Sequence, residues 1–137
     1  VGHSLAGPCI SWIQDFPSNI KKIIFWDPAF EMKTTWEKCY KDGNVIRYSS
    51  SGKHIEVSQD MYEEFLADNF LDILEQQKFP KQNISAIYAS WDRHKNNQIT
   101  TNKMWIVSCI IEGANHWFTQ EWKYEELFLQ TLKYIQK

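Results

Sequence analysis

The sequence carries no large excess of charge and no long apolar run. Its 137 residues include 15 Lys or Arg and 17 Asp or Glu, which gives a formal net charge of -2 at pH 7. Nucleic acids and anionic lipid surfaces attract clustered Lys and Arg, and a helix that crosses a bilayer needs about 20 mostly apolar residues. The composition therefore predicts no nucleic-acid partner and no membrane partner, and we expect no signal peptide.

Cysteine is also scarce, with Cys9, Cys39 and Cys109 scattered along the chain. An odd number of cysteines without a short paired spacing fits neither a disulfide framework nor a zinc motif. We therefore expect reduced thiols and a cytoplasmic location. The remaining composition, with 43% hydrophobic and 23% charged residues, is that of an ordinary globular domain.

The most informative short motif lies at the beginning of the chain, where Ser4 stands between Gly2 and Ala6. A turn that leads from a strand into a helix, and raises a serine hydroxyl above a sheet, brings the backbone before the serine close to the backbone after it. The residues two positions to either side must then be small, as Gly2 and Ala6 are. The pattern alone is common, so its interpretation depends on the rest of the chain.

The hydrophobic pattern predicts a mixed α/β fold. Apolar residues recur at helical spacing in several segments, and runs of β-branched and aromatic residues separate them. The continuous apolar character of such runs is typical of strands buried on both faces of a parallel sheet. The predicted elements are helices over residues 5–16, 32–41, 59–78 and 121–136, strands over 20–26, 84–89 and 104–111, and a hairpin formed by 45–48 and 54–57.

These elements divide the chain into three segments. Residues 1–30 hold the serine turn, a helix and a strand, and residues 31–83 form an insertion that we interpret as a lid. Residues 84–137 return to the first domain with two strands and a terminal helix. A strand, helix and strand in this order form a right-handed crossover unit of an α/β sheet.

Three candidate site residues follow predicted strands in the order serine, acid, histidine: Ser4, Asp92 and His116. The carboxyl ends of parallel strands are where α/β sheets place their reactive groups. With its motifs GHSLAG, YASWD and EGANHW, the chain resembles the C-terminal half of the α/β-hydrolase superfamily, and in particular its serine esterases and lipases. The resemblance implies a partial α/β-hydrolase fold of parallel strands, crossover helices and a lid insertion.

The same resemblance assigns a role to each residue. It makes Ser4 the nucleophile, His116 the general base, and Asp92 the carboxylate that orients the imidazole ring. The backbone N–H of Leu5 would be one donor of the oxyanion hole. The resemblance implies neither a cofactor nor a metal ion.

Asp27 is an alternative acid. It follows the predicted strand over residues 20–26, and its Asp-Pro-Ala sequence resembles the acid position of pancreatic-type lipases. We prefer Asp92, because Asp-Pro after that strand is also a common turn in hydrolases whose acid lies later in the chain.

Two functions are consistent with the resemblance. The first is hydrolysis of a carboxylic ester, or a similar small acyl substrate, through an acyl-enzyme. The second is a non-catalytic or incomplete hydrolase fragment that acts as a scaffold, because little of what the family places before the serine turn precedes Ser4 in this sequence. An open apolar edge along residues 20–26 would then invite pairing. We therefore expect either a complementary N-terminal half on another chain or self-association.

Overall fold

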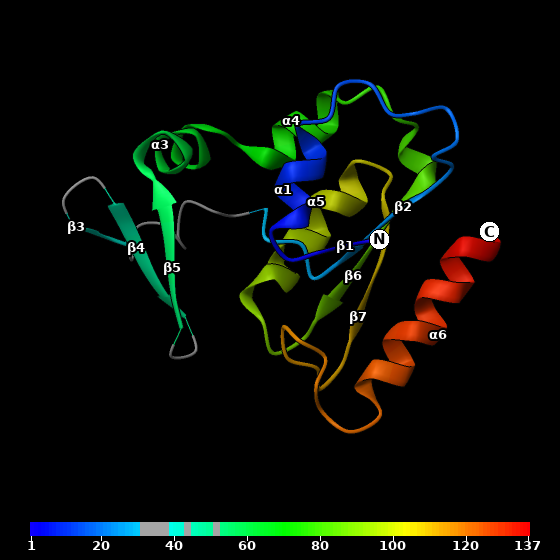
Figure 1. Cartoon of the computed structure of the whole chain (residues 1–137). Coiled ribbons are helices and arrows are strands. Elements are labelled where there is room, and N and C mark those ends of the chain that lie inside the picture. The colour runs from blue at the N-terminus through cyan, green and yellow to red at the C-terminus, as the bar shows by residue number, and fades with distance from the viewer. Residues whose placement is uncertain (31–38, 43–44, 51–52) are drawn as a thin grey trace. The chain divides into compact units, whose positions relative to one another are not determined.

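Two units make up the structure (Figure 1). The computed structural model describes residues 1–30, 39–42, 45–50 and 53–137. The first unit consists of Val1–Phe30 and Phe70–Lys137, and the second of Glu31–Asn69. The second unit starts at the same residue as the predicted insertion over residues 31–83 and lies within it. Helix α4 (Phe70–Gln76) belongs to the first unit, because Phe70 packs edge-on against Trp12, just after helix α1 (Ala6–Ser11), with ring centroids 5.2 Å apart.

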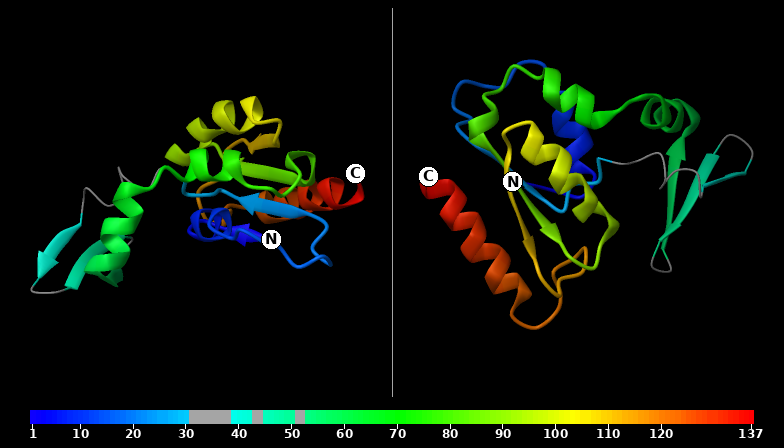
Figure 2. Two further views of the ribbon diagram at one scale, coloured as in Figure 1. Left: turned by 90° about the horizontal axis from the view of Figure 1, so that it is seen from above. Right: turned by 180° about the vertical axis from the view of Figure 1, so that it is seen from behind.

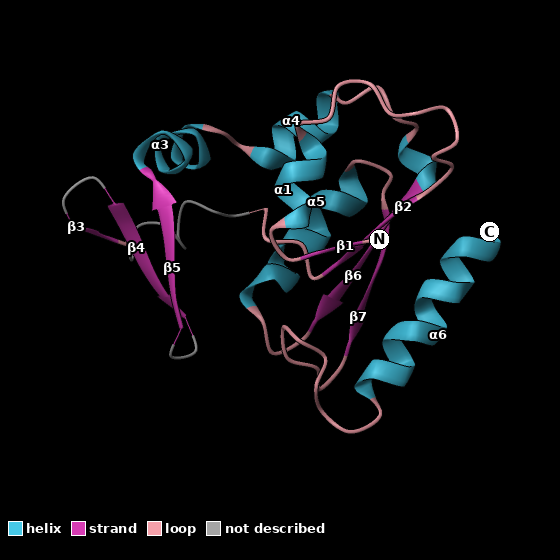
Figure 3. Ribbon diagram, viewed as in Figure 1, coloured by secondary structure: helices cyan, strands magenta, loops and turns pink. Residues whose placement is uncertain are grey.

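The first unit is built on a four-stranded parallel sheet (Figure 3). Its strands, in spatial order, are β1 (Gly2–His3), β2 (Ile23–Trp26), β6 (Ile84–Ala89) and β7 (Val107–Ile111), and each neighbouring pair is parallel. Parallel strands need crossover connections, and helices usually supply them, so the chain has the mixed α/β fold that the hydrophobic pattern predicts. Strand β1 pairs with Phe25 and Trp26 of β2, and this part of the predicted open edge is therefore covered.

Helices cover both faces of this sheet. Successive side chains along a strand point to opposite faces, and Ile87 and Ala89 of β6 join a buried cluster with Leu127 of α6 (Lys123–Gln136). Tyr88 points the other way, and its hydroxyl lies 3.4 Å from the hydroxyl of Thr101 on α5 (Asn97–Lys103). Figure 2 shows α6 separated from α1, α4 and α5 by the strands. Among the helices of the described residues, none is long and apolar enough to cross a membrane.

Helix α6 buries one narrow stripe of side chains. Leu127, Thr131 and Tyr134 are buried, whereas Tyr124 and Phe128 of the same helix are exposed. The buried positions follow the i, i+4, i+7 spacing of a single line along a helix. The indole N–H of Trp26 on β2 donates to the hydroxyl of Thr131 at 2.9 Å and so ties this line to the sheet.

Helix α1 is shorter than the predicted helix over residues 5–16. It ends at Ser11, and the side-chain amide of Gln77 donates to the carbonyl oxygens of Ile10, Ser11 and Ile13 at 3.0, 3.1 and 2.9 Å. The last carbonyl groups of a helix have no partner within the helix. Here Gln77, which lies far along the chain, supplies that partner, and the sequence near α1 does not predict this contact.

Two other segments differ from the sequence prediction. The helix expected from residue 59 is divided into α3 (Gln59–Ala67) and α4, because Asp68 has an extended backbone and Asp side chains compete for the hydrogen bonds of a helix. Residues 93–103, for which the hydrophobic pattern predicts no helix or strand, form η2 (Arg93–Asn96) and α5. Packing stabilises α5, since its Thr101 is fully buried. A further short helix, η1 (Lys81–Asn83), precedes β6.

The second unit contains a three-stranded antiparallel sheet followed by α3. Its strands are β3 (Tyr40–Asp42), β4 (Val45–Ser50) and β5 (Lys53–Ser58). The predicted hairpin is confirmed, because β4 and β5 pair antiparallel, with Ile46 opposite Val57 and Tyr48 opposite Ile55. Ser58 caps α3, since its hydroxyl accepts a hydrogen bond from the backbone N–H of Met61 at 3.2 Å. Most of the short helix predicted over residues 32–41 lies outside the described residues, and its last part is in β3.

Gly7 on α1 leads to a prediction about stability. A Cβ atom at this position would lie 2.8 Å from Cβ of Pro28 and 3.3 Å from Cε1 of Phe30. The Pro28 ring cannot move aside without moving the backbone next to Asp27. We therefore expect Gly7→Ala to lower the free energy of unfolding in urea by about 1–3 kcal/mol.

The matched control is Cys9→Ala, at an exposed position of the same helix. It should change the free energy of unfolding by less than about 0.5 kcal/mol. Equal unfolding curves for the two variants would contradict close packing between α1 and Pro28.

Candidate active site

Ser4 lies in a strained turn between β1 and α1. Its backbone φ is +55°, in the left-handed region that residues other than glycine rarely adopt. Three backbone hydrogen bonds hold it there: its N–H donates to Trp26 at 3.0 Å, and its carbonyl oxygen accepts from Gly7 at 3.0 Å and from Ala29 at 3.1 Å. Non-glycine residues in this conformation cluster at functional sites, where the surrounding structure enforces it.

The small residues around Ser4 are required by this turn. A Cβ atom on Gly2 would lie 3.1 Å from Cβ of Ala6 and 2.7 Å from the end of the Ile10 side chain. The backbones before and after Ser4 therefore approach each other as the sequence predicts. A larger residue at either position would force the turn open.

His116 approaches Ser4 from the loop after β7. Its Nε2 atom lies 2.8 Å from the Ser4 hydroxyl oxygen. The loop is shaped by Gly113, which has a φ of +73°, and by Asn115, whose side-chain oxygen accepts from the backbone of Trp117 at 3.1 Å and of Thr119 at 3.2 Å. The short distance places a base next to a hydroxyl that is nearly un-ionised at neutral pH.

His3 also positions His116. The sequence places His3 next to Ser4 but does not indicate this role. The Nε2 atom of His3 lies 2.8 Å from the carbonyl oxygen of His116, and the two rings are 4.8 Å apart between centroids. Burial lowers the pKa of His3 below its ordinary value, although the bond to His116 opposes this effect. We therefore expect a neutral His3 that donates its Nε2 proton to the carbonyl oxygen.

Asp27 is the acid closest to His116. Its Oδ2 atom lies 2.6 Å from Nδ1 of His116, and its Oδ1 atom accepts from the backbone N–H of Ala89 at 3.0 Å. Asp27 follows β2, is fully buried, and has a φ of +42°. A carboxylate can only accept hydrogen bonds, so Nδ1 carries the proton and Nε2 is left to accept from Ser4.

Asp92, the acid preferred from the sequence, lies farther away. It follows β6, and its Oδ2 atom is 3.5 Å from Nδ1 of His116, beyond the usual length of an N–H···O hydrogen bond. Its Oδ1 atom instead accepts from the backbone of His94 at 3.0 Å, as the cap of η2. The geometry thus reverses the preference for Asp92 over Asp27. Both follow parallel strands at the same edge of the sheet, and only their three-dimensional placement separates them.

The end of β6 is attached to the loop that carries His116. The Ser90 hydroxyl accepts from the backbone of Gly113 at 2.8 Å, and the backbone N–H of Trp91 donates to the carbonyl oxygen of Ala114 at 2.9 Å. These bonds bring Asp92 near His116 even though it is not the closest acid. Leu5, the predicted oxyanion donor, is the N-cap of α1, where backbone N–H groups have no partner within the helix.

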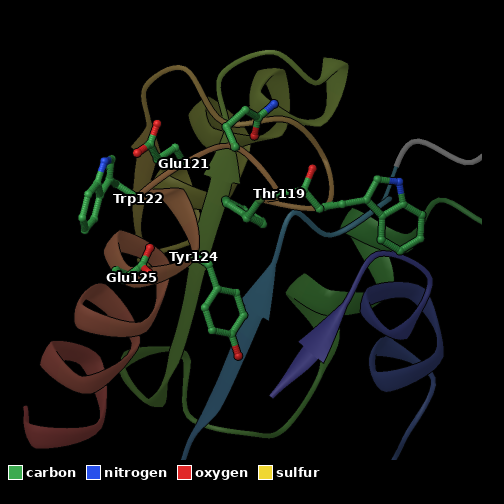
Figure 4. A pocket seen from close by; sticks show the side chains of 8 residues that line it. Thr119, Glu121, Trp122, Tyr124 and Glu125 are labelled. Atoms are coloured by element: carbon green, nitrogen blue, oxygen red, sulfur yellow. The ribbon is translucent and has the colours of Figure 1, made fainter.

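A surface depression of about 510 Å³ lies beside the loop that follows His116 (Figure 4). Figure 4 shows Glu121, Trp122 and Glu125 together on one side of it. The residues that line it are Trp117, Phe118, Thr119, Gln120, Glu121, Trp122, Tyr124 and Glu125. Ser4, Asp27 and His116 are not among these described lining residues, so the depression is next to the candidate site and does not contain it.

Comparisons with known proteins agree with the fold. No protein-family model matches the sequence, and no curated protein matches it. Among solved structures, the chain is similar to the esterase domain of a protein from Rhodothermus marinus, with a TM-score of 0.71 and 12% sequence identity. The similarity covers 92% of this chain and 55% of the other, so the chain spans about half the length of that structure. At this level of identity, the likeness establishes an esterase-like fold.

Proposed function

We propose that this protein is a serine hydrolase of the α/β-hydrolase type that cleaves a carboxylic ester or a similar small acyl substrate. The observation that carries the proposal is the continuous series of contacts from Ser4 to His116 at 2.8 Å and from His116 to Asp27 at 2.6 Å. A nucleophile, a base and a group that orients the base are the parts that acyl transfer by a serine requires. The esterase-like fold supports the same reaction class.

Each residue of the series has one task in the first half of the proposed reaction. The Ser4 oxygen attacks the acyl carbon while Nε2 of His116 takes the hydroxyl proton. Asp27 keeps the Nδ1 proton in place and stabilises the imidazolium ion that forms. The carbonyl π bond opens to an oxyanion, which the backbone N–H of Leu5 stabilises; one such donor typically contributes about 2.7–4 kcal/mol.

The second half of the reaction reverses these roles. His116 gives its proton to the leaving alkoxide, the ester C–O bond breaks, and an acyl group remains on Ser4. A water molecule then attacks this acyl-enzyme, and His116 takes a proton from the water and returns it to Ser4. The products are a carboxylic acid and an alcohol, and the cycle uses the side chains of Ser4, His116 and Asp27 and the backbone N–H of Leu5.

Covalent labelling tests this proposal. A fluorophosphonate reacts with a serine only when that serine is activated as a nucleophile, so we expect one adduct, located on Ser4 by mass spectrometry of the digested protein. Ser18→Ala removes an exposed serine and should leave the labelling unchanged. A protein that remains unlabelled, or that is labelled at another serine, would contradict the proposal and favour a non-catalytic hydrolase scaffold.

A further inference from the structure

We propose that Asp92, His94 and His116 form a binding site for one divalent transition-metal ion such as Zn²⁺, and that the bound ion inhibits the hydrolase. These residues come from two elements, since Asp92 and His94 lie at η2 and His116 lies in the loop after β7. The binding site stands on its own geometry. The inhibition rests on the proposed function, because it acts through His116.

The spacing of the possible ligand atoms carries the proposal. The Asp92 carboxylate lies between two imidazole rings, with Oδ1 3.6 Å from Nε2 of His94 and Oδ2 3.5 Å from Nδ1 of His116. Both distances are too long for hydrogen bonds. A tetrahedral Zn²⁺ ion with bonds of 2.0–2.2 Å holds its ligand atoms about 3.4 Å apart. One potential ligand atom from each residue lies within 4.8 Å of the others, so no pair of ligand atoms needs to approach by more than about 1.4 Å.

The residues are positioned and accessible as a metal site requires. His94 is 5% exposed, and its backbone N–H donates to Asp92 Oδ1 at 3.0 Å, so the cap of η2 holds the first two ligands together. The side chains of Asp92 and His116 are 20% and 18% exposed, which leaves a path for an ion and for a water ligand. Two imidazoles and one carboxylate suit Zn²⁺ and similar ions, whereas Mg²⁺ and Ca²⁺ prefer oxygen ligands.

Metal binding would remove the general base whichever ring atom of His116 is used. An ion on Nδ1 displaces the proton shared with Asp27, and the neutral ring then carries its proton on Nε2 and cannot accept one from Ser4. An ion on Nε2 occupies the lone pair that faces Ser4. Both cases leave the Ser4 hydroxyl without a base, so the bound ion inhibits acyl transfer.

The first experiment measures metal binding alone. The protein, with its cysteines alkylated so that thiolates cannot bind the ion, is titrated with Zn²⁺ against a chromophoric chelator. We expect one Zn²⁺ site in the unsubstituted protein. In His94→Ala and in His94→Phe the affinity for Zn²⁺ should be at least about tenfold weaker, because loss of an outer-shell partner alone lowers metal affinity by about 10–100-fold. The phenylalanine variant preserves the buried ring if the alanine variant does not fold. The control is His54→Ala on β5 in the second unit, which should bind as the unsubstituted protein does.

The second experiment measures hydrolysis of an aryl ester with and without Zn²⁺, as a ratio to each variant's own metal-free rate. We expect Zn²⁺ to inhibit the unsubstituted protein, a chelator to reverse this, and both His94 variants to resist it at the same ion concentration. Equal affinity in the protein and its His94 variants would overturn the metal site, even if the ester is hydrolysed. Binding that depends on His94 in a protein that hydrolyses no ester would support the site and contradict the inhibitory role together with the proposed function.

Discussion

Replacing Ser4 with alanine is expected to lower kcat for an aryl ester by a factor on the order of 10⁶, because the proposed reaction has no other nucleophile. His116→Ala should have a similar effect, since Ser4 is not deprotonated without its base. The two side chains act as one unit, so the double variant should be no worse than either single variant. Initial rates at saturating substrate measure all three variants.

Ser4→Gly distinguishes loss of chemistry from loss of fold. The left-handed backbone at Ser4 costs a residue with a Cβ atom about 1–2 kcal/mol, and glycine removes that strain. The glycine variant should therefore be as inactive as Ser4→Ala and no less stable to urea than the unsubstituted protein. A glycine variant that unfolds more easily would contradict the strained turn, and residual activity within a hundredfold of the unsubstituted protein would contradict Ser4 as the nucleophile.

The second large effect concerns the acid. Asp27→Asn is expected to lower kcat by about 10⁴-fold, because the amide presents a donor to Nδ1 and favours the tautomer in which Nε2 cannot accept the Ser4 proton. The asparagine oxygen can still accept the hydrogen bond from Ala89, so the substitution preserves the packing around a fully buried side chain. Rates with a simple aryl ester measure this loss.

Asp92→Asn is the matched comparison. At 3.5 Å from His116 and partly exposed, Asp92 contributes an interaction of at most about 1 kcal/mol, so kcat should fall by less than about tenfold. The asparagine oxygen can still cap η2 by accepting from His94. A large loss in Asp92→Asn together with a small loss in Asp27→Asn would show that Asp92 is the acid, as the sequence first indicated.

Much of the local structure around Ser4 could be predicted from the sequence. Gly2 and Ala6 are small because the backbone on the two sides of Ser4 must come close, and that requirement can be recognised within five residues. The apolar runs Ile23–Trp26 and Ile84–Ala89 are continuous because both faces of a parallel strand are buried. The order of Ser4, the two candidate acids and His116 follows from these elements, since each residue lies just after a strand.

The choice between the acids depended on tertiary structure, as did several helix boundaries. Asp27 and Asp92 have equivalent local contexts, each at the carboxyl end of a parallel strand, and a difference of about 1 Å in their distance to His116 arises only when β2, β6 and the loop after β7 are assembled. Helix α1 ends where Gln77 reaches it from a distant segment. Contacts between residues far apart in the chain leave no periodic pattern.

By itself, the sequence determined the mixed α/β fold and the residues that could carry the chemistry, because hydrophobic periodicity and turn requirements are local properties of the chain. The tertiary structure alone decided which atoms of those residues meet. It placed Asp27 rather than Asp92 within hydrogen-bonding distance of His116, brought His3 onto the His116 carbonyl group, and put Asp92 between two histidines. Hydrogen bonding and metal coordination depend on separations of a few tenths of an ångström, and only the packing of the whole unit sets distances on that scale.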